Sequence, residues 1–475
     1  MSVRCSAPTG STEMAGIPLS RRGFCAGLAA GAILGRPAFA AAPTPLTARP
    51  ATVQLAPEGY AATKVWSYDG TVPGTTLRAK QGGRLTRRLV NELPVPTSVH
   101  WHGIRIDNAM DGVAGLTQEP VPAGGSFDYD FVLPDAGTYW YHAHTNSMEQ
   151  VARGLSGPLI IEEADAYDVD RDEVLMLDDW LLDPETGAFR GGDHPVTLSH
   201  AGRTGNLVGT NGQFAFSLPA KRHERLRLRL INAANARIFV LRLAGLEGWT
   251  VAVDGMPLPE PEPLSDELVL APAQRIDLVV DVTAEEGETA GLLRRDTDGT
   301  WQPQAMVPVT GQASIARRGV PAALPPNPKM EVSGLKDARR LTMALEGGAM
   351  SGLESARYKG RELGFRGLMQ EGQFWALAGQ AGMADVPFAR LSRGETVRLG
   401  LTNQTMFPHA MHLHGMHFRT VGADGTLGPM RDTVLTFPNE TVEIAFVADN
   451  PGKWLLHCHM LGHAASGMTT WIEVA

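Results

Sequence analysis

The chain has 475 residues, of which 43% are hydrophobic and 20% are charged. This balance is that of a soluble globular protein and excludes a largely disordered chain, and the length allows about two to four domains. The formal net charge of -9 argues against nucleic acid as a partner. The 53 Gly and 33 Pro residues, with few long amphipathic runs, favour a loop-rich all-β chain.

The N-terminus carries an export signal rather than part of the fold. Residues 20–24 read S-R-R-G-F, a twin-arginine signature, and an apolar run of small residues follows at 25–34. An A-x-A cleavage site at 38–40 predicts that residues 1–40 are removed. The apolar run is too short for a membrane anchor. We therefore expect the twin-arginine export machinery as a partner and a periplasmic location.

The cysteine content fits export. Cys5 and Cys25 leave with the signal, so Cys458 remains as a lone thiol that has no partner for an internal disulfide. A lone thiol is a liability in an oxidising compartment unless it is buried or bound. We expect Cys458 to be bound to something.

Short strand-like runs separated by turn residues recur along the rest of the chain. We expect strands at 86–91, 126–133, 226–231, 275–282, 396–401 and 440–447. Many short strands with Gly and Pro turns indicate β-sandwiches or barrels. Residues 344–372 are rich in Gly and Glu and have few β-branched residues, so they predict an insertion or a long loop.

An internal repeat relates the two ends of the chain. V-H-W-H-G at 99–103 and G-T-Y-W-Y-H-A-H at 137–144 resemble M-H-L-H-G at 411–415 and G-K-W-L-L-H-C-H at 452–459. The segment 228–282 has similar strand texture but no paired histidines.

The repeat predicts three β domains, of which the first and third each carry half of a site. We place them at 41–166, 167–322 and 323–475, the middle one without metal ligands. Residues 165–172 and the Pro-rich stretch 319–328 are the expected linkers.

Most of the 14 histidines fall into four short clusters. Residues i and i+2 of a strand project from the same face, about 6.5–7 Å apart, so an H-x-H pair can bind one metal or two neighbouring ones. The four pairs are His100/His102, His142/His144, His412/His414 and His457/His459. Eight imidazoles exceed what one tetrahedral ion can use and predict several metals between two domains. The remaining histidines, His194, His200, His223 and His417, are interpreted as ordinary core or surface residues.

Cys458 lies inside the last of these pairs, so its thiolate points to the opposite side of the strand from the two imidazoles. On that side, the pattern H-C-H-x3-H-x4-M supplies His463 and Met468, and His409 is the spare first residue of H-x2-H-x-H. Two His, one Cys and a weak axial Met make a blue-copper site. Met468 alone could be a core methionine, and its spacing after the cysteine favours a ligand.

The motifs H-W-H-G, H-x-H, H-x2-H-x-H and H-C-H-x3-H-x4-M, in this order, resemble the copper signatures of the multicopper oxidases, which include laccases and bacterial cuprous oxidases. The resemblance covers nearly the whole mature chain, including Y-D-G-T-V-P-G at 68–74. It implies an all-β fold of three consecutive cupredoxin-like domains, each a Greek-key β-barrel or sandwich, and four copper ions per chain.

The resemblance also implies a division of the ligands. The type 1 copper would take His409, Cys458, His463 and Met468, and the type 2 copper would take His100 and His412. The type 3 pair would divide His102, His142 and His459 from His144, His414 and His457. A reducing substrate would give one electron at a time to the type 1 copper, and O2 would be reduced to water at the other three.

Two aspartates and one alanine bear on protons and substrate. Asp111 is followed by Gly, most often a turn signal, but by resemblance we expect it to be a proton relay. Bacterial relatives often have Glu where this chain has Ala464, so the sequence does not predict how protons are supplied on that side of the cluster. Asp432, in the sequence R-D-T, matches an Asp-Thr segment that lies near the substrate in members of the family. We therefore expect Asp432 to contact a phenol or Cu(I).

The expected function is therefore a laccase-like oxidation of phenols or aromatic amines with O2 as acceptor. The alternative is a periplasmic cuprous oxidase for copper tolerance, although Met343, Met350, Met369 and Met383 are spread out rather than clustered as soft Cu(I) ligands. Two other classes of protein fit the sequence less well. A copper nitrite reductase has no trinuclear copper cluster, and a non-catalytic scaffold would not need the complete set of copper ligands that this chain has. We expect a monomer.

Overall fold

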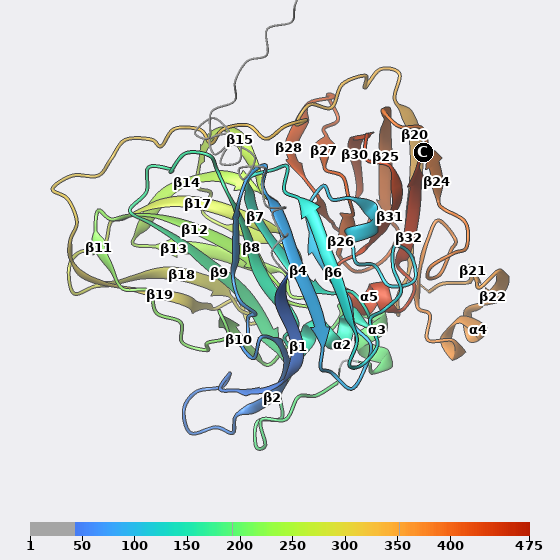
Figure 1. Ribbon diagram of the computed structural model, residues 1–475, viewed down its shortest axis with the longest axis horizontal. Coiled ribbons are helices and arrows are strands. Elements are labelled where there is room, and N and C mark those ends of the chain that lie inside the picture. Colours follow the sequence, from blue (N-terminus) through green and yellow to red (C-terminus); the bar gives the residue numbers. More distant parts are fainter. Residues whose placement is uncertain (1–42, 192, 351) are drawn as a thin grey trace, which may run out of the picture. The chain divides into compact units, whose positions relative to one another are not determined.

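Short β-strands form most of the regular structure in the computed structural model, which describes residues 43–191, 193–350 and 352–475 (Figure 1). The predicted signal, residues 1–40, lies outside these residues. Thr44–Ala475 is one compact unit. None of the helices in the described part is long and apolar enough to cross a membrane.

The first region of the unit has eight strands. They are β1 (Thr44–Val53), β2 (Thr63–Tyr68), β3 (Leu77–Lys80), β4 (Arg84–Asn91), β5 (Val99–His102), β6 (Ser126–Val132), β7 (Gly137–Ala143) and β8 (Ser156–Glu162). They pair into two sheets with the orders β2-β1-β4-β6 and β3-β8-β7-β5.

The middle region has eleven strands. They are β9 (Arg171–Trp180), β10 (Leu207–Thr210), β11 (Ala220–Arg222), β12 (Arg225–Asn232), β13 (Phe239–Ala244), β14 (Leu246–Val253), β15 (Met256–Pro263), β16 (Leu268–Leu270), β17 (Arg275–Val282), β18 (Thr289–Arg295) and β19 (Trp301–Gln312). Their sheet orders are β10-β9-β12-β17-β14-β15 and β11-β19-β18-β13-β16.

The third region contains the remaining strands. They are β20 (Arg339–Gly347), β21 (Ser355–Tyr358), β22 (Arg361–Gly364), β23 (Trp375–Leu377), β24 (Ala389–Leu391), β25 (Glu395–Asn403), β26 (His409–Leu413), β27 (Phe418–Val421), β28 (Leu427–Arg431), β29 (Thr433–Thr436), β30 (Thr441–Ala448), β31 (Gly452–Cys458) and β32 (Thr469–Val474). The two main sheets have the orders β23-β20-β25-β30-β27-β28 and β24-β32-β31-β26-β29, and β21 pairs with β22 alone.

The same pairing scheme recurs in all three regions. One sheet of each contains a parallel pair, β1 with β4, β9 with β12 and β20 with β25. The other sheet contains the parallel pairs β3 with β8, β11 with β19 and β24 with β32. The all-β fold expected from the sequence is confirmed, whereas the domain boundaries at 166/167 and 322/323 stay predictions.

The expected strands are confirmed to within two residues, as β4, β6, β12, β17, β25 and β30. The interpretation of 344–372 as a long loop is wrong in part, because β20 continues to Gly347 and a β21–β22 hairpin and the helix α4 (Phe365–Gln370) follow. The other interpretation, an insertion, stays a prediction. Lys359 and Gly360 have φ values of 47° and 73° and form the two-residue hairpin turn. The glycine that suggested a loop therefore belongs to a turn between strands.

Strand β12 alternates Arg and Leu, and this pattern ties the middle region to the first. The leucines face the core of the middle region, and the arginines face away from it but are only 1% exposed. Arg225 pairs with Asp281, and Arg227 pairs with Asp277. Arg229 donates from Nη1 to Thr138 Oγ1 in the first region at 2.9 Å.

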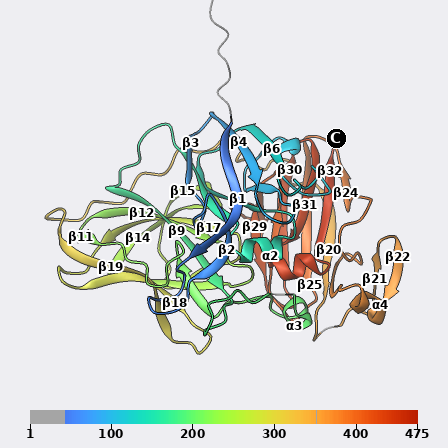
Figure 2. The same ribbon diagram turned by 60° about the horizontal axis from the view of Figure 1, so that its bottom comes forward.

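One short helix from each region contributes to a common apolar contact. The helices are α2 (Ser147–Ala152), α3 (Pro195–Ser199) and α5 (Leu461–Ala465). Met148 and Leu461 belong to one buried cluster, and Leu198 packs against it. Figure 2 shows α2 beside α5, next to the strands that carry the histidines. The contact brings all three regions together near the candidate site.

Candidate metal centres

Antiparallel pairing places the histidines of each half opposite one another. In the first region His100 on β5 faces His142 on β7, and in the third region His412 on β26 faces His457 on β31. The second histidine of each H-x-H pair follows on the same face. The sequence repeat therefore corresponds to two equivalent strand pairs.

The two halves meet ring against ring. His100 stacks on His414 with ring centroids 3.9 Å apart, and His102 stacks on His412 at 3.8 Å. Groups of three possible ligand atoms lie within 4.8 Å of one another, and they include His100/His102/His142, His100/His412/His414 and His144/His414/His457. The structure thus brings the histidines of the four H-x-H pairs into one cluster.

The hydrogen-bond partners of two histidines define which ring nitrogens are unprotonated. Nδ1 of His414 lies 3.0 Å from Asp111 Oδ2 and donates to it, and Nδ1 of His457 donates to the carbonyl of Cys458 at 2.9 Å. Their Nε2 atoms, 3.2 Å apart, then face each other with lone pairs. Such lone pairs repel unless a cation lies between them.

Other ring nitrogens of the cluster have no hydrogen-bond partner within the described residues. They are His100 Nε2, His102 Nδ1, His144 Nε2, His412 Nε2 and His459 Nδ1. Buried polar atoms are nearly always paired in native structures, and neutral imidazoles are preferred ligands of copper. The donor set therefore fits copper.

Burial keeps these histidines neutral. It lowers the pKa of His144 to about 3, and it holds the pKa values of His142 and His459 well below the ordinary value of 6.5. Neighbouring imidazoles lower the pKa values further. A metal that binds here displaces no protons from the ligands at neutral pH.

A second cluster surrounds Cys458, which is buried and unpaired. Its Sγ lies 3.7 Å from Nδ1 of His409 and from Nδ1 of His463, and these two nitrogens are 3.0 Å apart. Met468 is fully buried, and its backbone pairs with both Cys458 and His463. The four residues expected at a blue-copper site therefore come together.

The outer nitrogens of this cluster are also satisfied. His463 Nε2 donates to the carbonyl of His200 at 2.6 Å, and His409 Nε2 donates to the hydroxyl of Thr405 at 2.8 Å. Both Nδ1 atoms are therefore unprotonated and point at one place. Burial raises the pKa of the Cys458 thiol to about 12, so a bound cation is what would stabilise the thiolate.

Asp111 is completely buried between two stacked histidines. Its Oδ1 is 3.2 Å from His100 Nδ1, and its Oδ2 is 3.0 Å from His414 Nδ1. The sequence placed this carboxylate beside the cluster, and the structure has it there. Its role in proton transfer stays a prediction.

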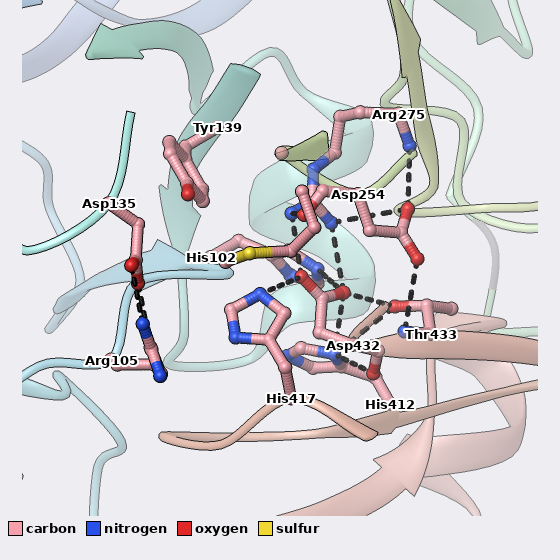
Figure 3. Close-up of polar contacts among 12 residues, drawn as sticks. His102, Arg105, Asp135, Tyr139, Asp254, Arg275, His412, His417, Asp432 and Thr433 are labelled. Atoms are coloured by element: carbon pink, nitrogen blue, oxygen red, sulfur yellow. Dashed lines mark hydrogen bonds and ion pairs between the residues drawn. The ribbon is translucent and has the colours of Figure 1, made fainter. Parts of the chain in front are cut away.

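Asp432 does not lie where the sequence suggested. The expected contact with a substrate is not met, because the side chain is 0% exposed and is bonded to His102 Nε2 at 3.2 Å. The backbone carbonyl of Asp432 also lies 2.9 Å from His412 Nδ1, and Arg275 holds both carboxylate oxygens (Figure 3). The R-D-T segment approaches the histidine cluster rather than the surface near Cys458.

Two contacts of the candidate sites were missed from the sequence. Arg275 is an ordinary-looking residue at the start of a strand, and the contact of His200 is made by its backbone, so neither had a motif. His417, interpreted from the sequence as an ordinary core or surface residue, is 6% exposed, and its Nε2 is 3.7 Å from Asp432 Oδ2. Neither of its ring nitrogens has a hydrogen-bond partner among the described residues.

Comparisons with known proteins agree with this geometry. Multicopper oxidase family models match residues 50–166, 135–288 and 365–475. The chain belongs to the multicopper oxidase family. It is therefore a copper-dependent oxidoreductase that uses O2, and the predicted fold of cupredoxin-like domains is confirmed.

Two solved structures match this chain over nearly their whole length. A multi-copper oxidase from Pseudomonas thermotolerans is 35% identical with a TM-score of 0.79, and the match covers 91% of this chain and 98% of that chain. Lac15 from a marine microbial metagenome is 41% identical with a TM-score of 0.74, covering 91% and 100%.

Curated relatives include proteins named for different roles. Multicopper oxidase MmcO of Mycobacterium tuberculosis is 29% identical over 90% of this chain and 86% of its own length. Copper resistance protein A of Pseudomonas syringae pv. tomato is 26% identical, covering 96% and 99%. Laccase-1 of Botryotinia fuckeliana is 29% identical, covering 85% and 77%.

Proposed function

We propose that this multicopper oxidase couples one-electron oxidation of phenols or aromatic amines at a type 1 copper to the four-electron reduction of O2 to water at a trinuclear copper cluster. The type 1 ligands are His409, Cys458, His463 and Met468. The type 2 ligands are His100 and His412, and the type 3 ligands are His102, His142, His144, His414, His457 and His459. The proposal includes four copper ions per chain.

The observation that carries this proposal is the position of Cys458 between two histidines of the other cluster. The thiol faces His409 and His463, whereas the adjacent His457 and His459 face the histidine cluster. Copper, when bound, supplies the one-electron steps and the reduction of O2. The short covalent link along β31 gives the electrons a direct route between the two sites.

Asp111 is the proposed proton relay. Reduction of O2 to water consumes protons as well as electrons, so an acid is needed beside the cluster. Asp111 bridges the stacked rings of His100 and His414, and Ala464, which replaces an acid, lines a cavity of about 200 Å³ with His144 and His457. We propose that protons are delivered from the side of Asp111.

Electrons enter through a covered histidine. His463 is fully buried, and its Nε2 donates to the carbonyl of His200. The segment 195–200, here called the cap, is held by Leu198, whose carbonyl accepts from Trp375 Nε1 at 2.6 Å and from Ser466 Oγ at 3.1 Å. A substrate docks on the cap and donates its electron across the hydrogen bond between His200 and His463, and displacement of the cap would let a bulky phenol come closer to His463.

The surface near the cap suits an aromatic substrate. Val196 in α3 is 54% exposed, and Met406 is 53% exposed. Phe407, next to Met406, has its ring 5.7 Å from that of His200. Exposed apolar side chains of this kind bind aromatic rings through hydrophobic contact.

A cuprous oxidase is the second candidate, and two exposed methionines favour it. Met350 is 70% exposed and follows Ala349, whose N–H donates to the carbonyl of Ser199 in the cap. Met406 is the other, and thioethers are soft ligands for Cu(I). Met343, in contrast, is fully buried in the core and binds no substrate.

The two candidates separate in one experiment. Oxidation of 2,6-dimethoxyphenol and of Cu(I) is measured for the wild type, for Met350→Leu/Met406→Leu and for the matched control Met306→Leu in β19. We expect phenol oxidation that needs no added copper and persists in both variants, because leucine keeps the apolar character of Met406. Cu(I) oxidation that exceeds phenol oxidation and falls only in the double variant would overturn the phenol proposal in favour of the cuprous oxidase.

We also propose that the protein is exported by the twin-arginine pathway to the periplasm and acts as a monomer. The S-R-R-G-F motif at 20–24 and the single thiol of the mature chain support export. Replacement of Arg21 and Arg22 by Lys is expected to leave the protein in the cytoplasmic fraction. Recovery of that variant in the periplasm would contradict the proposal.

A further inference from the structure

The middle region has no copper ligand, yet one of its side chains reaches the histidine cluster. Arg275 begins β17 and is 0% exposed. Its Nη1 donates to Asp432 Oδ1 at 2.9 Å, and its Nη2 donates to Asp432 Oδ2 at 2.6 Å. This is the two-pronged geometry of the strongest Arg–carboxylate pairs.

Asp432 also accepts a hydrogen bond from one histidine of each half of the cluster. Its carboxylate accepts from His102 Nε2 of the first region at 3.2 Å, and its backbone carbonyl accepts from His412 Nδ1 of the third region at 2.9 Å. Protonation of these nitrogens leaves His102 Nδ1 and His412 Nε2 unprotonated, and neither has a hydrogen-bond partner in the part of the chain that the structure describes. Asp432 therefore sets the tautomer and direction of two stacked rings.

The arginine is itself fixed by all three regions. Its Nε donates to the carbonyl of Thr138 in the first region at 3.2 Å, and its Nη2 donates to the carbonyl of Asp254 at 2.9 Å. The guanidinium also lies 5.8 Å from the ring centroid of Tyr139 (Figure 3). Asp432 supplies the contact from the third region.

A second set of hydrogen bonds joins the middle and third regions beside the ion pair of Arg275 and Asp432. Asp254 accepts from the backbone N–H of Arg275 at 2.9 Å and from that of Thr433 at 3.3 Å. Gln274 Nε2 donates to the carbonyl of Thr433 at 3.1 Å. The middle region thus holds the backbone on one side of Asp432 as well as its carboxylate.

The ion pair packs directly against the backbone of Gly103. Gly103, which ends the H-W-H-G motif, has a φ of 85°, and a Cβ atom there would lie 2.3 Å from Arg275 Nη2 and 2.7 Å from Asp432 Oδ2. The glycine of a first-region motif is therefore explained by an ion pair between the middle and third regions.

We propose that Arg275 is a positioning residue, through which the middle region holds Asp432 and so aligns His102 and His412 for the trinuclear copper cluster. This inference rests on the proposed copper ligands. The Asp432 carboxylate accepts hydrogen bonds from Arg275 and from His102 at once.

The test compares Arg275→Met with Arg275→Lys and with a matched control, Arg225→Met. Arg225 forms an equally buried two-pronged pair with Asp281 on neighbouring strands of the same sheet, and none of its hydrogen-bond or ion-pair partners among the described residues is a histidine. Each copper-loaded protein is analysed for copper per chain, the blue absorption, the type 2 paramagnetic resonance signal and the near-ultraviolet type 3 band.

We expect Arg275→Met to keep the blue absorption but to bind the trinuclear copper about 10- to 100-fold more weakly, with loss of the type 2 and type 3 signals. Lysine keeps the positive charge but cannot donate two parallel hydrogen bonds to the carboxylate, so Arg275→Lys should retain part of the signals that Arg275→Met loses. Arg225→Met should keep all copper signals. Full signals in Arg275→Met, or the same loss in Arg225→Met, would overturn the proposal.

A lone buried carboxylate could prevent Arg275→Met from folding. The double variant Arg275→Met/Asp432→Asn removes both charges, and we expect it to fold and show blue absorption without the type 2 signal. A normal type 2 signal in it would also overturn the proposal. Absence of that signal from the wild-type protein would instead contradict the proposed function.

Discussion

The ring of His102 lies on the ring of His412, with centroids 3.8 Å apart and an angle of 20° between the planes. The two residues come from different regions, and their outer nitrogens share Asp432 as a partner. The cluster is therefore an interface between the first and third regions, and its geometry depends on how the regions pack.

Replacement of Gly103 tests this packing. Gly103→Ala should destabilise the protein by about 2 kcal/mol or more, because the methyl group meets Arg275 and Asp432 in addition to straining a positive φ. Gly82→Ala is the control, since Gly82 has a φ of 76° but nothing within 4 Å of an added Cβ. Denaturant unfolding of both variants measures the difference. Equal effects would mean that the Gly103 site can relax.

Cys458→Ser should abolish the blue absorption and lower the copper content by one ion per chain. The serine hydroxyl does not ionise at neutral pH and is a poor ligand for the softer copper site. The type 2 resonance signal should persist, because Cys458 faces away from the histidine cluster. A retained blue band would show that the type 1 assignment is wrong.

Asp111→Asn should keep the blue absorption and slow O2 reduction about 100-fold, because an amide holds the ring of His414 but delivers no proton. Reoxidation of the fully reduced protein by O2, followed by absorption, measures this step directly. Asp128→Asn, at an exposed position paired with Arg88, is the control. Unchanged reoxidation in Asp111→Asn would remove Asp111 from the mechanism.

Release of the cap should speed oxidation of bulky phenols. Trp375→Phe/Ser466→Ala removes both side-chain hydrogen bonds to Leu198, which together stabilise the closed cap by about 2 kcal/mol. We expect kcat/KM to rise more for a bulky phenol than for hexacyanoferrate(II). Trp471→Phe removes a similar bond, to Ala384, and should change neither value. Equal changes for both donors would show that the cap does not select by size.

His417 should make the protein less stable in acid. Burial lowers the pKa of this residue to about 3 from 6.5, so the folded state stays neutral while the unfolded state takes up a proton as the pH falls below 6.5. Stability is therefore lost with falling pH, by about 2 kcal/mol at pH 5 relative to pH 7.5.

The His417→Gln variant has no imidazole to titrate at this position. Its loss of stability between pH 7.5 and pH 5 should therefore be smaller than that of the wild type by about 2 kcal/mol. Denaturant midpoints at the two pH values measure the effect, and His194→Gln, at an exposed position, should behave as the wild type. A variant with the wild-type pH dependence would show that His417 does not titrate in this way.

The sequence predicted the site where the chemistry is local. The period of a strand placed His100 and His102 on one face, and the same period turned Cys458 away from His457. These inferences needed only the alternation of side chains along a strand. The repeat then indicated that two such strand pairs form one site.

What the sequence did not predict depends on contacts between distant segments. Asp432 follows a strand and could equally have faced solvent, and its burial follows from the approach of Arg275 in another region. His463 is covered by the backbone carbonyl of His200. A contact made by the backbone does not restrict which amino acid stands at that position, so the sequence cannot indicate it. Pairings of this kind are set by how the regions pack, which no local pattern encodes.

The central claim is tested most directly by the stoichiometry of O2 consumption. The copper-loaded protein oxidises hexacyanoferrate(II), a one-electron donor, while an electrode records O2 and a peroxidase assay records hydrogen peroxide. We predict one O2 consumed for every four electrons, with no peroxide. One O2 for every two electrons, with an equal amount of peroxide, would contradict reduction of O2 to water at a trinuclear cluster.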